Sequence, residues 1–152
     1  MLRDDIDRQI VALLRDNARL PYPAIAERVG LSAPAVKRRI DRLVADGTIT
    51  AFTVAVDPAA VGATTEAFVE LFCAGRTSPA QLRDLAESHP AVVAAYTVTG
   101  SADALFHLRC TSTQDLEATL EHIRASDVVE RTDSVIVLSR LVDRAGALAP
   151  LR

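Results

Sequence analysis

The sequence predicts an α+β protein in two parts, a helical N-terminal part and a C-terminal part in which strands and helices alternate. Up to Gly47, apolar residues recur at the three- and four-residue spacing of helices that each bury one face. After Ala63 the order of apolar runs and helical segments is strand, helix, strand, strand, helix, strand. With 152 residues, 49% of them hydrophobic, the chain can form one domain or two small ones. We assign residues 1–50 to the helical part, 51–62 to a hinge strand and linker, and 63–152 to the mixed part.

Two short helices are expected first. Asp4 or Asp5 can cap a helix that ends near Asn17. A second helix over 22–29 tolerates Pro23 in its first turn and stops at Gly30. The apolar residues of the first helix keep helical spacing: Ile6, Ile10, Leu13 and Leu14.

A third helix is expected within residues 31–47, with Ser32 as its N-cap and Gly47 at its end. The short turn before it gives the spacing of a helix-turn-helix. One stripe of this helix is apolar and is predicted to be buried: Val36, Ile40, Leu43 and Val44. The remaining surface is small and cationic, with Ala35, Arg38 and Arg42 away from the stripe and Lys37 and Arg39 on its flanks. Such a surface could enter a DNA major groove, or it could be only a solvated face.

Charge is distributed unevenly along the chain. Residues 1–50 hold nine Arg/Lys and seven Asp/Glu, a net +2, and residues 51–152 hold eight and thirteen, a net −5. Positive charge is concentrated in the third helix, which favours a nucleic-acid binder with a separate acidic domain.

The segment 48–56 alternates β-branched or aromatic residues and is expected to form a wing or a hinge strand. In the mixed part, strands are expected over 67–74, 92–99, 104–110 and 132–141. Helices are expected to begin at Ser78-Pro79 and at Ser112 or Thr113. This order predicts the ferredoxin-like βαββαβ sandwich, with both helices on one sheet face. The other face carries Leu105, His107 and Arg109, and we expect it to be an interface at which His107 titrates.

The sequence gives no sign of catalytic, metal or cofactor chemistry. It lacks phosphate-binding and metalloprotease motifs, and its three histidines are scattered. Cys73 and Cys110 would lie at opposite ends of neighbouring antiparallel strands and should not form a disulfide. No apolar run has the length of a membrane span and no signal peptide is evident, so we expect a cytoplasmic protein.

The chain resembles the Lrp/AsnC family of feast/famine regulators over nearly its whole length. The resemblance rests on Asp7, Arg19, residues 28–32, Arg39, Leu43, Gly47 and Ile49, and on residues 98–100 with Asp103. It implies a winged helix-turn-helix joined by a hinge to a ligand-binding domain, and dimers that assemble into tetramers or octamers. It also implies a free amino acid as effector, bound near the turn at residues 100–103.

The expected effector residues are Val98, Thr99, Gly100, Ser101, Ala102 and Asp103, with Thr132 and Ser134 on the last strand. Family members often have an acid and an aromatic where this chain has Ser101 and Ala102. Backbone amides of the turn and the Asp103 carboxylate could bind the head of an amino acid, and the missing aromatic favours an effector with a side chain larger than that of alanine. Alternatively, Asp103 only closes a hairpin.

The expected function is therefore a sequence-specific DNA-binding transcriptional regulator that reads an inverted-repeat operator as a homodimer. Arg38 and Arg42, with Ala35 and Ser32, would face the bases, and Lys37 and Arg39 would hold phosphates, although Arg39 could instead pack structurally. One alternative is a tetrapyrrole (sirohaem) decarboxylase, because such enzymes resemble this family. Another is an amino-acid-sensing assembly protein without its own DNA target.

Overall fold

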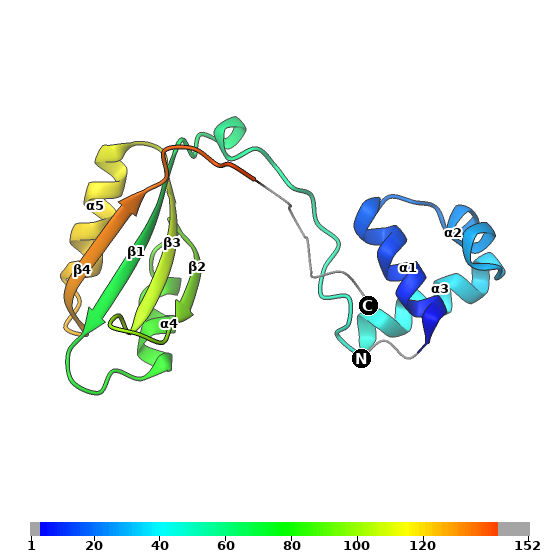
Figure 1. The fold of residues 1–152 in the computed structure, drawn as a ribbon, viewed down its shortest axis with the longest axis horizontal. Helices are drawn as coiled ribbons and strands as arrows, with labels where there is room; N and C mark the ends of the chain where they lie inside the picture. The colour runs from blue at the N-terminus through cyan, green and yellow to red at the C-terminus, as the bar shows by residue number, and fades with distance from the viewer. Residues whose placement is uncertain (1–3, 143–152) are drawn as a thin grey trace. The chain divides into compact units, whose positions relative to one another are not determined.

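The computed structural model describes residues 4–142. The chain divides into two compact units, one formed by residues up to Ala55 and the other beginning at Val56 (Figure 1). Each unit has its own hydrophobic core.

The first unit is a bundle of three helices, α1 (Asp5–Asp16), α2 (Tyr22–Val29) and α3 (Ala33–Ala45). Its core is formed by one stripe from each helix: Ile10, Leu14, Ile25, Ala26, Val29, Val36, Ile40 and Leu43. The predicted stripe of α3 is confirmed except at Val44, whose exposed fraction is 46%. Val44 lies in the last turn of α3.

The helix ends follow the predicted signals. The Asp4 carboxylate accepts a hydrogen bond from the Asp7 amide at 2.8 Å, so Asp4 caps α1. The Ser32 hydroxyl accepts one from the Ala35 amide at 3.4 Å. Between α2 and α3, Gly30 has φ +69°, a left-handed conformation that glycine adopts without steric cost. The helix-turn-helix geometry predicted from the sequence is therefore present.

The predicted strand over 48–56 is wrong for this chain. Residues 51–57 form neither helix nor strand, and Phe52, Val54 and Val56 are exposed. A strand needs a neighbour to hydrogen-bond with, and no described segment of the chain lies beside this one as a strand. A short 3-10 helix, η1 (Pro58–Val61), follows it.

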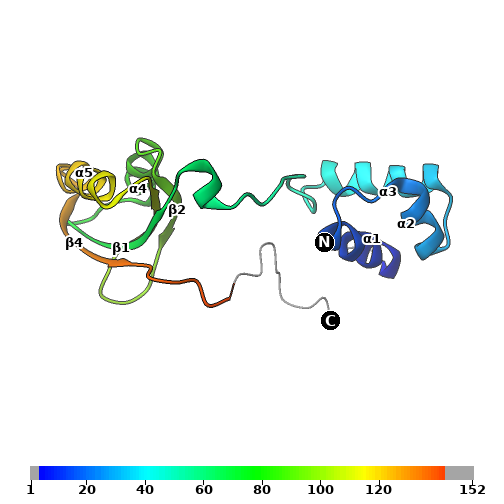
Figure 2. The same ribbon diagram turned by 90° about the horizontal axis from the view of Figure 1, so that it is seen from above.

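The second unit is a four-stranded antiparallel sheet with two helices on one face. Its elements are β1 (Thr65–Cys73), α4 (Pro79–Glu87), β2 (Val92–Thr97), β3 (Ala104–Cys110), α5 (Thr113–Arg124) and β4 (Val129–Ile136). The strand order is β2-β3-β1-β4, which confirms the ferredoxin-like topology. Figure 2 shows α4 and α5 lying on the same side of the sheet, so its other face is open within the chain.

Two strands differ from their predicted bounds. β2 ends at Thr97 rather than residue 99, because its pairing with β3 ends where Thr97 faces Ala104. β4 runs over Val129–Ile136 rather than 132–141, because β1 offers partners only from Cys73 back to Ala67. The bounds of both strands are thus set by the strands they pair with, which the sequence of one segment does not reveal.

The core of the second unit lies between the sheet and the helices. It includes Val69 and Leu71 of β1, Phe106 and Leu108 of β3, and Ile123 of α5. Cys110 faces Thr65 across the sheet while Cys73 lies at the other end of β1, and both are free thiols as predicted. Burial raises the pKa of both thiols. Within residues 4–142, no helix has the length and apolar character needed to cross a membrane.

Candidate nucleic-acid interface and effector site

The predicted DNA-facing residues lie along one side of α3 and differ in how their side chains are held. Arg38 is exposed and makes no ion pair with any residue in the described range 4–142. Lys37 is also exposed, but its Nζ lies 2.6 Å from Asp41 Oδ2, one turn along the helix. Ser32 is occupied as the N-cap, and Ala35 is half-buried.

Arg39 and Arg42 instead bind two carboxylates at the start of α1, those of its N-cap Asp4 and of Asp7. Arg39 Nη1 donates to Asp4 Oδ2 at 2.7 Å and to Asp7 Oδ1 at 2.8 Å. Arg42 Nη2 donates to Asp7 Oδ2 at 2.6 Å. Asp7 has no exposed surface, so each oxygen of a fully buried carboxylate is paired with an arginine of α3. We call these four residues the α1–α3 ion cluster.

The electrostatics of the cluster favour the charged forms of Asp4 and Arg39. The hydrogen bond from the Asp7 amide, followed by that from Arg39, holds the pKa of Asp4 below its ordinary value. Hydrogen bonds to Asp4 and Asp7 raise the pKa of Arg39 further. The cluster therefore ties α3 to the first turn of α1 and fixes which side of α3 faces outward.

In this geometry Arg42, predicted to face the bases, and Arg39, predicted to hold phosphates or to pack structurally, both bind carboxylates at the start of α1. Neither guanidinium is a free cation, and the side-chain exposures are 35% for Arg42 and 23% for Arg39. The helical wheel places Arg42 away from the apolar stripe, but a long side chain reaches α1 from there. A signal was present in the sequence, because Asp4 and Asp7 have the same three-residue spacing as Arg39 and Arg42.

The expected effector residues 98–103 form the connection between β2 and β3. The Asp103 amide donates to Leu71 O at 2.9 Å, and Asp103 Oδ2 accepts from the Cys73 amide at 2.8 Å. Asp103 thus fastens the turn to the end of β1, and the residue is exposed. Gly100 has φ +126°, and the Ala102 side chain is buried.

Thr132 and Ser134 are not brought into this turn within one chain. Thr132 pairs with Leu71 on the far side of β1, and its hydroxyl accepts a hydrogen bond from Arg124 Nε at 2.8 Å. Ser134 lines a hollow beside α5. Both side chains are therefore directed to the helix side of β4.

The open sheet face carries a second ion cluster around Glu66. His107 Nε2 lies 2.5 Å from Glu66 Oε1, and Arg140 Nη2 donates to Glu66 Oε2 at 2.8 Å. The His107 ring stacks on Phe68 with centroids 4.6 Å apart. Burial alone would raise the pKa of Glu66, but the hydrogen bonds from Arg140 and His107 outweigh it and the pKa is lowered.

The chain matches two family models that together cover both units. Residues 4–44 match the AsnC-type helix-turn-helix domain, and residues 66–147 match the Lrp/AsnC ligand binding domain. The chain belongs to the Lrp/AsnC family. The predicted resemblance is thereby confirmed.

Several Lrp/AsnC relatives are similar over nearly the full chain. The HTH-type transcriptional regulator Rv2324 of Mycobacterium tuberculosis is 50% identical over 93% of this chain and 95% of its own. The Escherichia coli AsnC structure is 27% identical with a TM-score of 0.88, covering 95% of this chain and 97% of that chain. The feast or famine regulatory protein Rv3291c of M. tuberculosis, solved with L-methionine, is 32% identical with a TM-score of 0.85, covering 93% and 95%.

These Lrp/AsnC relatives are transcriptional regulators and not enzymes, so the chain is a DNA-binding transcriptional regulator rather than a decarboxylase. Among residues 4–142 there is also no cluster of three or more side chains able to hold a metal ion.

Proposed function

We propose that this Lrp/AsnC protein binds a specific inverted-repeat operator and that a free amino acid, bound at the turn 98–103, controls its assembly and DNA binding. Two features support the proposal. Helix α3 of the first unit carries exposed cationic side chains, and the turn 98–103 of the second unit has groups that could bind a ligand. Both parts occur in a family of regulators, one of which was solved with L-methionine.

The observation that carries the DNA-binding part is the division of cations on α3. Arg39 and Arg42 are used to fix the helix, which leaves Arg38 as the arginine of α3 without an ion pair in the described chain. A free guanidinium at the outer surface can bind a guanine edge through two hydrogen bonds. Lys37, held by Asp41, would contact a phosphate, and Ser32 and Ala35 at the N-terminal end of α3 would face the bases with Arg38.

The operator symmetry follows from one recognition helix per chain. A homodimer with twofold symmetry presents two copies of α3, which would read half-sites about one helical turn of DNA apart. Larger assemblies, tetramers or octamers, would bring several such pairs to DNA.

The effector part is supported by the form of the turn. The amides of residues 99–102 have no acceptor within the described chain, and the Asp103 carboxylate adjoins them. Amides can bind the carboxylate of an amino acid and Asp103 its ammonium. The small side chains at Ser101 and Ala102 favour an effector larger than alanine.

DNA binding is tested by fluorescence anisotropy with a duplex obtained by in vitro selection on the protein. Arg38→Ala should weaken specific binding by about 1–3 kcal/mol, if its guanidinium makes a bidentate base contact. Arg76→Ala, an exposed cation of the other unit, is the matched control and should change nothing. An unchanged affinity of the Arg38 variant for the selected duplex would remove Arg38 from the interface.

The effector is sought by a thermal-shift screen of the twenty amino acids, because a ligand that binds only the native state raises the melting temperature. Asp103→Asn should abolish the shift of the best amino acid. Binding of only glycine and alanine would contradict the expected size of the effector.

A further inference from the structure

Two of the three histidines meet on the helix side of the second unit, although they are far apart in the sequence. His89 directly follows Ser88, the C-cap of α4, and His122 lies in the last turn of α5. Their ring centroids are 6.3 Å apart, with 46° between the ring planes. Both residues line a hollow of about 740 Å³. Only the fold brings these two side chains together, because the sequence places them in different elements.

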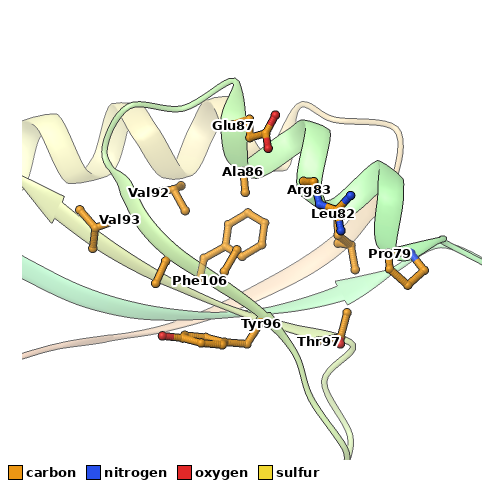
Figure 3. A pocket seen from close by; sticks show the side chains of 12 residues that line it. Pro79, Leu82, Arg83, Ala86, Glu87, Val92, Val93, Tyr96, Thr97 and Phe106 are labelled. Carbon is orange, nitrogen blue, oxygen red and sulfur yellow. The ribbon is translucent and has the colours of Figure 1, made fainter. Parts of the chain in front are cut away.

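The His89 ring is held in place and has one nitrogen available. Figure 3 shows Leu82 and Ala86 of α4 facing Phe106 of the sheet, which fixes the helix that His89 follows. His89 Nδ1 lies 2.9 Å from Leu85 O, and because a carbonyl oxygen can only accept, Nδ1 is the donor. In the neutral ring, Nε2 then carries a lone pair. Histidines that bind metal ions as a rule donate their other nitrogen to a carbonyl or a carboxylate in this way.

His122 supplies a second imidazole from the other helix. It is exposed, and neither of its ring nitrogens makes a hydrogen bond with a residue of the described range 4–142. A tetrahedral zinc ion with Zn–N bonds of about 2.1 Å would hold two ring centroids about 5 Å apart. The two rings therefore need to approach by only about 1 Å to share an ion, and rotation of the exposed His122 side chain is sufficient for this movement.

The charges around the hollow favour a cation. Hydrogen bonds from the Thr111 amide and hydroxyl hold the pKa of Asp115 below its ordinary value, so this lining carboxylate is ionised at neutral pH. Arg109 also lines the hollow, but its Nε lies 3.6 Å from Glu66 Oε1, a residue of the open sheet face. The C-terminal end of α4 adds partial negative charge beside His89.

We infer that His89 and His122 bind a divalent transition-metal ion of the class of zinc, nickel and copper. Imidazole nitrogen is a preferred ligand of these ions, whereas magnesium and calcium prefer oxygen. Two side chains are fewer than the three or four of catalytic and structural zinc sites, so water completes the coordination and the ion exchanges with solvent. The bound ion links α4 to α5. This site goes beyond the proposed function, since it uses neither the turn 98–103 nor the cations of α3.

The test is isothermal titration calorimetry of the full chain, without an affinity tag, with zinc chloride and with magnesium chloride. We expect zinc to bind at micromolar concentrations and magnesium not to bind. His122→Ala should weaken zinc binding at least tenfold and should melt at the wild-type temperature without metal, because it removes an exposed side chain. His89→Gln should weaken zinc binding as much, since its amide can still donate to Leu85 O but offers no imidazole.

Two variants are controls for other zinc ligands. His107→Gln removes the third histidine, which lies on the open face of the sheet, and Cys73→Ser removes a half-buried thiol. Both should bind zinc as the wild type does. Electron paramagnetic resonance of bound Cu²⁺ gives a readout that a merely structural role would not move. The nitrogen splitting should indicate two imidazole ligands in the wild type and one in His122→Ala.

Zinc affinity that is unchanged in both His122→Ala and His89→Gln would overturn the site. An equal loss in His107→Gln would show scattered binding to any histidine, and a loss confined to Cys73→Ser would place the ion on the thiol; either result would also overturn it. The same holds if the wild-type chain does not bind zinc at micromolar concentrations. The amino-acid screen and the operator titration use no metal ion, so they test the proposed function separately.

Discussion

Asp7 determines how the cations of α3 are divided between structure and recognition. A fully buried carboxylate is costly unless its charge is paired, and here each oxygen accepts from a different arginine of α3. The orientation of α3 therefore depends on these two contacts with Asp7. Arg38, which has no such partner among residues 4–142, can be replaced without affecting the fold.

Arg42→Ala should therefore lower the stability of the fold, whereas Arg38→Ala should leave it almost unchanged. Arg42→Ala leaves one oxygen of a buried carboxylate without its arginine and should lower the free energy of unfolding by about 1–3 kcal/mol. Arg38→Ala should change it by no more than about 0.5 kcal/mol, as is usual for an exposed site. Urea unfolding of the full chain measures both. Equal stability of the two variants would mean that the ion cluster does not hold α3.

The lowered pKa of Asp4 predicts an acid-sensitive contribution to stability. Because the folded-state pKa lies below that of the unfolded chain, the contribution is complete above the unfolded value, about 3.9, and is lost as the pH falls through the folded one. Asp4→Asn keeps an N-cap but removes the charge. Melting temperatures between pH 7 and pH 2.5 should fall less steeply for this variant than for the wild type. Parallel curves would contradict the role of the charge.

At the scale of elements, the turn between α2 and α3 depends on Gly30. Its φ of +69° is strained for other residues, yet a Cβ placed there would meet no atom within 4 Å. Gly30→Ala should therefore cost only the conformational term, about 1–2 kcal/mol, and Gly30→Asn less, since asparagine tolerates this region better. Urea unfolding of the wild type, Gly30→Asn and Gly30→Ala should give free energies of unfolding that decrease in this order. Equal loss in both variants would indicate a steric rather than a conformational cause.

Elements were predicted from the sequence where local signals decide them. Caps at Asp4 and Ser32, the stop at Gly30 and the alternation of Phe106 and Leu108 are properties of short segments, and all are present in the structure. The segment 48–56 also alternates, but a strand depends on a partner that the described chain does not supply. Likewise, the Arg42 contact with Asp7 joins residues 35 positions apart, which helical periodicity alone does not reveal.

At the scale of the whole molecule, the open face of the sheet is the surface through which we expect two copies to join. It carries apolar side chains beside the Glu66 ion cluster, and Val135, opposite Phe68 in the β1/β4 register, has an exposed fraction of 65%. A sheet with one face covered by helices and the other apolar in part is typical of an interface.

Val135→Asp should weaken dimerisation by at least about tenfold, because burying an unpaired carboxylate at the interface costs more than about 1.4 kcal/mol. The loss should be visible by sedimentation velocity over a dilution series. Ala118→Asp, exposed on α5, introduces the same charge on the helix side and is the control. Because Val135 is exposed in the single chain, the variant should melt at the wild-type temperature when both are monomeric. If Val135→Asp dimerises as the wild type does while Ala118→Asp does not, the copies join through the helices instead, and the two α3 helices would be spaced on DNA by a different surface.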